Sequence, residues 1–348
     1  MKEKRFFSGA AMNSYYPYGN MSFYEEERLH RLKKKISRIS IGFVLYTFVA
    51  YVAILLIQLF LSLFGLAEAL ESSIYFQWAI SLLPLYLFGL PTVILFLKST
   101  NPTPLKKSNM SLADLLLLFL IGRFFTLAGS YISSFLTSVT ERILRRPITD
   151  ATTEMIEASP VWLIFISAVI IGPIVEEFLY RKVIIDRLHT HGEMFAILFS
   201  SVIFALAHGN LYQVFYAFLN GCILALIYIR TGKLWYSTVF HMVSNFLGSI
   251  AVLPILKAQS VLEGVAEGAE YGARELSLTL LIGGYGLTKW FLALLGAAVL
   301  CFCYKQFMPS KRALEPIPHG KAFSSVLKSP GFIAFLCLSI LEFAISLL

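Results

Sequence analysis

Three short motifs place charged and polar side chains inside apolar segments of the sequence. They are Glu176-Glu177-x-x-x-Arg181, Phe204-x-x-x-His208 and His241-x-x-x-Asn245. A charged side chain such as Asp, Lys or Arg at the centre of a membrane helix costs about 2.5–3.5 kcal/mol. A pair of glutamates with an arginine is therefore expected to face protein or water, where it can serve a functional site.

The spacing within each motif assigns the side chains to helix faces. Residues four apart lie on one face, so Glu177 can pair with Arg181. By the same rule His241 and Asn245 can point at one spot. Glu176 is turned about 100° from Glu177 at 3.6 residues per turn, so the two glutamates need not do the same work.

Together the motifs supply the groups needed for water-mediated hydrolysis of an amide. A buried carboxylate can take a proton from water and later pass it to the leaving amine. One histidine can help to position that water. His241 and Asn245 can donate hydrogen bonds to the oxyanion of the tetrahedral intermediate, and such a donor is worth about 2.7–4 kcal/mol in other enzymes.

The same residue types are also compatible with a zinc ion. Two histidines and a glutamate form a zinc set with an open fourth position, here Glu176, His208 and His241. The sequence lacks the His-Glu-x-x-His helix of the zincins. Spacing alone leaves both the metal-free and the zinc-dependent chemistry open.

The composition shows that membrane helices must carry these motifs. Hydrophobic residues make up 57% of the 348 residues and charged residues 14%, with a mean hydropathy of +0.72. A soluble domain has about a quarter charged residues. The net charge of +8 is concentrated in loops and in the first forty residues, as expected of a membrane protein with a cytoplasmic face. Nucleic acid is therefore not an expected partner.

The apolar blocks predict an all-α fold, a polytopic transmembrane bundle of about eight to nine helices. Each long block has about the 20 residues that cross roughly 30 Å of hydrocarbon. The candidate site lies between the fourth, fifth and seventh blocks, and the fifth is too short to cross. The expected blocks are residues 41–66, 74–97, 112–137, 162–185, 195–207, 211–229, 234–256, 278–304 and 331–348.

The chain divides by composition into four regions. Residues 1–40 form a basic segment without a cleavable signal pattern, and 41–138 form the N-terminal membrane helices. Residues 160–256 hold the motifs, and 278–348 form the C-terminal membrane helices. Placing the N-terminus in the cytoplasm puts most basic loops inside and the acidic loops outside. We therefore expect a multi-pass protein of the cell membrane with a cytoplasmic N-terminus.

The three motifs, in this order on successive apolar segments, resemble the CPBP family, also called ABI or CAAX-protease-like. That family includes the type II CAAX prenyl endopeptidases. The resemblance covers about residues 160–250 and implies an intramembrane endopeptidase. It implies catalytic roles for Glu176, His208, His241 and Asn245, with Glu177 and Arg181 in support. It favours a metal-free mechanism in which Glu176 activates water, although the family was first described as metal-dependent.

We expect the substrate to be a membrane-associated peptide or protein, with CAAX-type and prenylated peptides among the candidates, and the bilayer to be the other partner. A non-catalytic scaffold or bacteriocin-immunity factor of the same family is the main alternative, since some members act in that way. A proton-coupled transporter is disfavoured because the sequence shows no two-fold repeat or paired broken helices. The motifs could also have a purely structural role, in which Glu176, Glu177 and Arg181 form an ion pair and His241 and Asn245 form interhelical hydrogen bonds.

Overall fold

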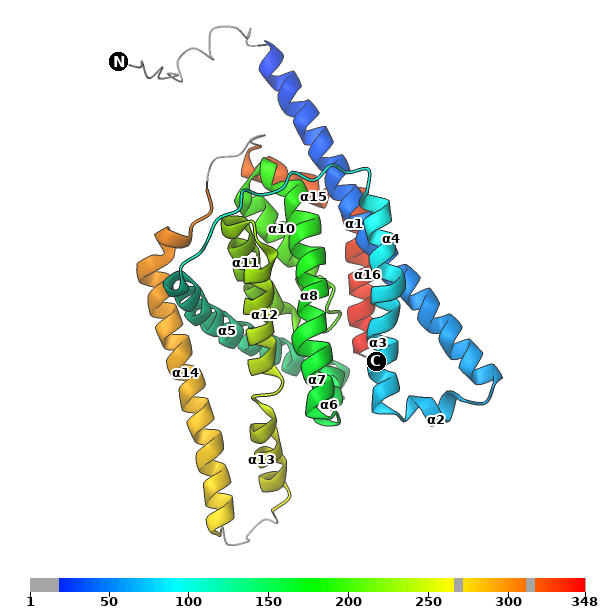
Figure 1. Ribbon diagram of the computed structural model, residues 1–348, viewed down its shortest axis with the longest axis vertical. Helices are drawn as coiled ribbons and strands as arrows, with labels where there is room; N and C mark the ends of the chain where they lie inside the picture. The colour runs from blue at the N-terminus through cyan, green and yellow to red at the C-terminus, as the bar shows by residue number, and fades with distance from the viewer. Residues whose placement is uncertain (1–18, 266–271, 311–316, 348) are drawn as a thin grey trace.

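The computed structural model describes residues 19–265, 272–310 and 317–347, and all regular structure in these ranges is helical (Figure 1). Seven helical segments of this part are long and apolar enough to cross a membrane. They are Tyr24–Leu63 within α1 (Gly19–Leu63), Ile74–Leu97, α5 (Leu112–Leu144), Val161–His191, α11 (Val214–Thr231), Leu234–Glu263 and α14 (Ala273–Phe307). The protein is therefore an all-α, multi-pass membrane bundle, as the sequence predicts.

Several of these spans are composed of shorter helical pieces. The second contains α3 (Ile74–Pro84), the π-helical η1 (Leu85–Gly89) and α4 (Leu90–Leu97). The fourth contains α7 (Val161–Ile164), η2 (Phe165–Ile171), α8 (Gly172–Glu176), η3 (Glu177–Val183), α9 (Ile184–Leu188) and η4 (His189–His191). The remaining helices are α2 (Ala67–Glu71), α6 (Ala151–Glu157), α10 (Glu193–Leu206), α12 (Leu234–Gly248), α13 (Leu253–Glu263), α15 (His319–Leu327) and α16 (Pro330–Ser346).

The boundaries refine the expected blocks at three places. The first helix begins by Gly19, so the basic segment continues directly into the first span. The short fifth block is confirmed as α10, which has only 14 residues. The last expected block corresponds to α16, which is bent by 63° from the preceding α15, and the two make an eighth span if the pair is counted as one.

The basic segments predicted to share one side of the membrane meet at one end of the bundle. Lys35 Nζ lies 3.4 Å from His191 Nε2, and Arg187 Nε donates to Thr100 Oγ1 at 2.6 Å. Lys321 pairs with Glu25 at 2.8 Å. The segments therefore lie together, as the charge pattern predicts, whereas the orientation of this end stays a prediction.

Small residues let α5 approach its neighbours closely. A Cβ on Gly129 would lie 2.5 Å from Cα of Tyr216 in α11. Gly296 of α14 likewise has no room for a Cβ against the carbonyl of Leu120 in α5. Because the obstructing atoms are backbone, the helices must separate if a side chain is added.

Gly129→Ala is therefore expected to lower the stability of the bundle by about 1–3 kcal/mol. Thermal unfolding of the purified protein in detergent measures the effect. The matched control is Gly283→Ala in α14, where an added Cβ meets nothing within 4 Å. Equal melting temperatures for the two variants would contradict the close packing of α5 on α11.

Candidate active site

The helix that carries the glutamates changes its hydrogen-bond register just before them. The N–H of Gly172 donates to the carbonyl of Ser167, five residues back, which is π-helical pairing. The next residue, Pro173, has no N–H to donate. Neither residue therefore supplies a donor to the carbonyl of Ala168. Asn245 of α12 fills this place, because its Nδ2 donates to Ala168 O at 2.9 Å.

This contact makes a specific stability prediction. Asn245→Ala should cost about 1–3 kcal/mol, since it leaves a carbonyl at a helix contact without its donor. Pro173→Ala would restore a backbone N–H that can serve the same carbonyl. The double variant should therefore recover about 1 kcal/mol relative to additivity in a double-mutant cycle of thermal unfolding. Strict additivity of the two single changes would contradict this account.

Glu177 and Arg181 form a fully buried ion pair at the centre of the fourth span. Both side chains have no exposed surface, and Arg181 Nε lies 3.3 and 3.2 Å from the two carboxylate oxygens. Arg181 Nη1 donates to Ser200 Oγ at 2.9 Å, and that hydroxyl donates to the carbonyl of Tyr180 at 2.7 Å. The guanidinium also lies 4.8 Å from the ring centre of Phe204. The pair is thus held in place from α10.

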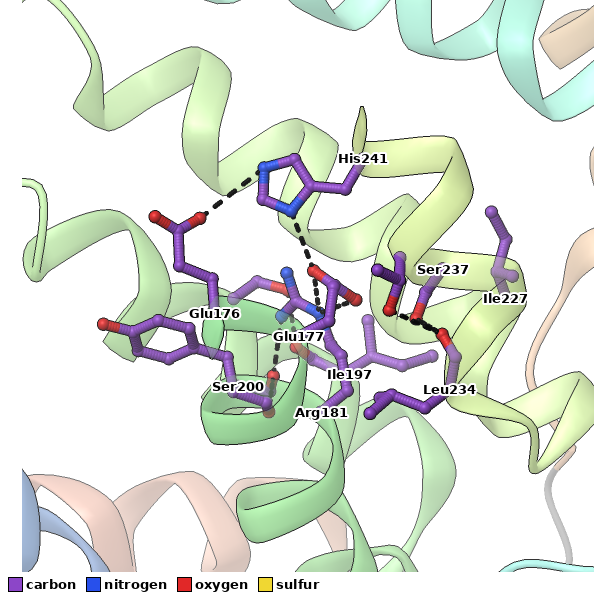
Figure 2. Close-up of polar contacts among 12 residues, drawn as sticks. Glu176, Glu177, Arg181, Ile197, Ser200, Ile227, Leu234, Ser237 and His241 are labelled. Atoms are coloured by element: carbon purple, nitrogen blue, oxygen red, sulfur yellow. Dashed lines mark hydrogen bonds and ion pairs between the residues drawn. The ribbon is translucent and has the colours of Figure 1, made fainter. Parts of the chain in front are cut away.

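His241 lies between the two glutamates (Figure 2). Its Nδ1 is 3.1 Å from Glu177 Oε1, and its Nε2 is 3.6 Å from Glu176 Oε2. A carboxylate held by Arg181 accepts, so Nδ1 carries the hydrogen in this contact. The other ring nitrogen then faces Glu176, as in catalytic arrangements where one carboxylate orients an imidazole for work on its far side.

The two glutamates have different surroundings, as their 100° separation predicts. Glu177 is fully enclosed by its partners, whereas 33% of the Glu176 side chain is exposed. Glu176 is therefore the carboxylate that a water molecule or a substrate can reach. Gly172 keeps space open beside it, since a Cβ there would lie 3.9 Å from Glu176 Oε1 and 4.0 Å from Tyr86 Oη.

His208 follows the end of the short helix α10 and is oriented by the backbone. Its Nδ1 lies 2.8 Å from the carbonyl of Phe204, which can only accept, so the hydrogen is on Nδ1. Nε2 of the neutral ring is then left as an acceptor. The Phe204 ring meets both imidazoles edge-on, with centroids 4.8 Å from His208 and 5.7 Å from His241. The Phe204 ring thus contacts His208, His241 and Arg181 and separates these side chains from one another.

The structure brings together the residues predicted from the sequence, except that Asn245 contacts the backbone of a neighbouring helix and not the other side chains. Glu176, Glu177, Arg181 and His241 form a continuous chain of contacts, which Phe204 extends to His208. Asn245 instead contacts the backbone of η2, one turn beyond His241 on α12. One of its two amide hydrogens is used there, which leaves the other for a further acceptor.

Two further residues of the site, Ser200 and Tyr86, are not among those predicted from the sequence. Ser200 stands four residues before Phe204 and eight before His208, so helical spacing could have placed it on the same face. Tyr86 lies on η1, which is distant in sequence and has no polar motif. No local pattern could have placed its hydroxyl near Glu176.

The residues in the described part do not form a ready metal cluster. No group of three His, Cys, Asp or Glu side chains in these ranges is arranged to hold an ion. The alternative zinc set of Glu176, His208 and His241 is therefore not assembled as such here. Metal dependence stays a question for a chelator experiment.

Comparison with known proteins finds matches to the region that carries the three motifs. Residues 158–247, which hold all three motifs, match the family model described as type II CAAX prenyl endopeptidase Rce1-like. MroQ of Staphylococcus aureus (strain USA300), named a membrane-embedded CAAX protease, is 30% identical over 206 residues. That match covers 56% of this chain and 79% of MroQ. The chain belongs to the CAAX-protease-like family.

A second relative of the CAAX-protease-like family matches a shorter stretch. YdiL of Bacillus subtilis (strain 168), provisionally named a membrane peptidase, is 36% identical over 98 residues. This match covers 28% of the chain and 39% of the length of YdiL. No solved structure matches. The family resemblance expected from the motifs is thus confirmed, and the protein is a multi-pass member of a family of membrane proteases.

Proposed function

We propose that this protein is an intramembrane endopeptidase in which Glu176 activates a water molecule to hydrolyse a peptide bond. The observation that carries the proposal is the chain of contacts from Arg181 through Glu177 to His241 and Glu176. In this chain a buried ion pair fixes an imidazole against a partly exposed carboxylate. A purely structural ion pair would need neither the second glutamate nor the histidine.

The proposed reaction begins when Glu176 takes a proton from water, with His208 Nε2 as a second acceptor that orients it. The oxygen of that water forms a bond to the carbonyl carbon, and the carbonyl electron pair moves to oxygen. One proposed donor to this oxyanion is the unused amide hydrogen of Asn245, and the other is His241 Nε2 in the imidazolium form, which carries a hydrogen on both ring nitrogens. When the carbon–nitrogen bond breaks, Glu176 returns its proton to the leaving amine.

The proposed substrates are peptides that are anchored to or inserted in the membrane, because Glu176 lies on a membrane span. The family description and the name of MroQ both refer to CAAX proteins. CAAX-type peptides, prenylated and unmodified, are therefore the first to test. We also propose that the N-terminus faces the cytoplasm, from the positive-inside distribution of Lys and Arg.

The decisive assay measures cleavage of a quenched fluorescent peptide library by purified protein in detergent, with and without a strong chelator. Wild-type cleavage that survives the chelator and disappears in Glu176→Ala supports the metal-free mechanism. Cleavage lost with the chelator would replace it by a metal-dependent one. Activity that persists in Glu176→Ala would refute the assignment of Glu176.

His208→Ala is expected to lower kcat by about 10²–10⁴-fold, the usual contribution of a positioned acid or base. Unaltered thermal unfolding would show that the loss is not due to misfolding. His189→Ala is the matched control, because that ring lies at the end of the span, where its Nε2 is 2.7 Å from the carbonyl of Thr103. A control that loses as much activity as His208→Ala would overturn the role of His208.

A further inference from the structure

A basic hollow lies where α1, α4 and α16 meet, far in sequence from the catalytic motifs. Its volume is about 640 Å³. It is lined on the α1 side by His30, Lys33, Lys34, Ser37, Arg38 and Ile41, and on the other side by Phe96 and Pro330. The α1 residues follow helical spacing, so they form one face of that helix. No lining residue is acidic, and the hollow therefore concentrates positive charge.

The packing of the opposite face of α1 fixes the direction in which the basic face points. Leu32, Ile36 and Ile39 are fully buried in the core of the bundle. On the α16 side, Gly331 N donates to Ser37 Oγ at 3.0 Å, and Gly331 has no room for a Cβ against the Ser37 carbonyl. The basic face thus cannot rotate into the bundle, and the hollow is part of the fold.

The guanidinium of Arg38 is fixed in position but keeps N–H donors that make no hydrogen bond to the described residues. Nη2 lies 3.3 Å from the carbonyl of Phe96, and the charged carbon sits 5.2 Å from the Phe96 ring centre. Nε is buried and makes no hydrogen bond to any described residue. Among the α1 carboxylates that precede the hollow, Glu25 pairs with Lys321 at 2.8 Å and Glu27 with Arg31 at 2.5 Å. Glu26 lies one turn before His30 and about three turns before Arg38. An anion that accepts several hydrogen bonds would satisfy Arg38 and the two lysines together.

The hollow is at the level where the helices pass from polar to apolar sequence. In α1, Arg38 is the last charged residue before the uncharged stretch that ends at Leu63. α4 ends at Leu97, directly before Lys98, and α16 begins at Pro330, two residues after Lys328. The phosphates of a bilayer lie at such a level, and Ile41 and Phe96 offer an apolar wall below it.

From these observations we propose that the hollow binds the phosphate of an anionic phospholipid headgroup. Lys33, Lys34 and Arg38 supply the charge, and the guanidinium fork of Arg38 supplies directed hydrogen bonds to phosphate oxygens. The proposal does not depend on proteolysis. It gives the first helix a specific lipid contact at the end of the bundle that carries the basic loops.

The test measures binding of phosphatidylglycerol to the purified full-length protein in a neutral detergent by native mass spectrometry. Lys33→Gln with Lys34→Gln is compared with Lys106→Gln with Lys107→Gln. The control is also an adjacent lysine pair, exposed and in the loop after α4. Each basic residue near the phosphate is expected to contribute about fivefold to the affinity. Substitution of Lys33 and Lys34 should therefore weaken binding roughly 25-fold, and substitution of Lys106 and Lys107 less than about twofold.

Arg38→Gln should weaken lipid binding as well. If the Arg38→Gln variant does not fold, the Lys33 and Lys34 double variant still tests the proposal. Two further probes identify the source of the phosphate. Phosphatidylcholine should bind much more weakly than phosphatidylglycerol, and inorganic phosphate at the same concentration should not compete. Equal losses in both lysine pairs, equal binding of the two lipids, or competition by inorganic phosphate would each overturn the proposal.

Discussion

Glu176→Gln is expected to reduce peptide hydrolysis by at least about 10²–10⁴-fold while leaving the bundle folded. Glutamine is nearly isosteric with glutamate but cannot take a proton from water. The side chain is one-third exposed, and its ion pair with His241 is 3.6 Å long, so its neutralisation removes little that holds the fold together. The loss should therefore appear in kcat with little change in KM, as for a group that acts on the transition state.

Two comparisons make this result specific to Glu176. Glu157→Gln at the exposed end of α6 removes the same charge elsewhere and should leave turnover unchanged. Glu177→Gln should lower both stability and turnover, because it releases Arg181 and His241 together. Wild-type kcat in purified Glu176→Gln would rule out the proposed mechanism.

Arg181→Met should destabilise the protein by about 3–5 kcal/mol, the largest effect on stability that we expect from a single change at the site. The substitution leaves the Glu177 carboxylate fully buried without its cation, and it removes the hydrogen bond that Arg181 donates to Ser200 Oγ. Thermal or denaturant unfolding in detergent measures the effect. Activity should fall as well, since Glu177 orients His241.

The chain offers a matched control for this prediction in Arg31 and Glu27, which are also four residues apart on a helix. That pair is 52% and 48% exposed, so Arg31→Met should cost no more than about 0.5 kcal/mol. Combining Arg181→Met with Glu177→Gln should recover part of the lost stability, because no unpaired charge then remains buried. Equal stability of the Arg181 and Arg31 variants would show that the buried pair does not hold the site.

The amino-acid sequence by itself determined the class of the fold and most residues of the candidate site. Hydrophobic blocks of membrane length are a local property, so they predict helices without knowledge of their neighbours. The 3.6-residue period likewise placed Glu177 with Arg181 and turned Glu176 away from them, and the structure has both features. The short length of α10 marked the helix that ends beside His208.

Only the tertiary structure decided how these residues work together. The contact of Asn245 with Ala168 depends on a π-helical register before Pro173 and on the position of α12 beside it. The placement of His241 between two glutamates, and of Tyr86 near Glu176, depends on how separate helices pack. The basic hollow also needs three helices that are far apart in sequence. Hydropathy and periodicity describe one helix at a time, whereas these contacts are set by the distances and rotations between helices.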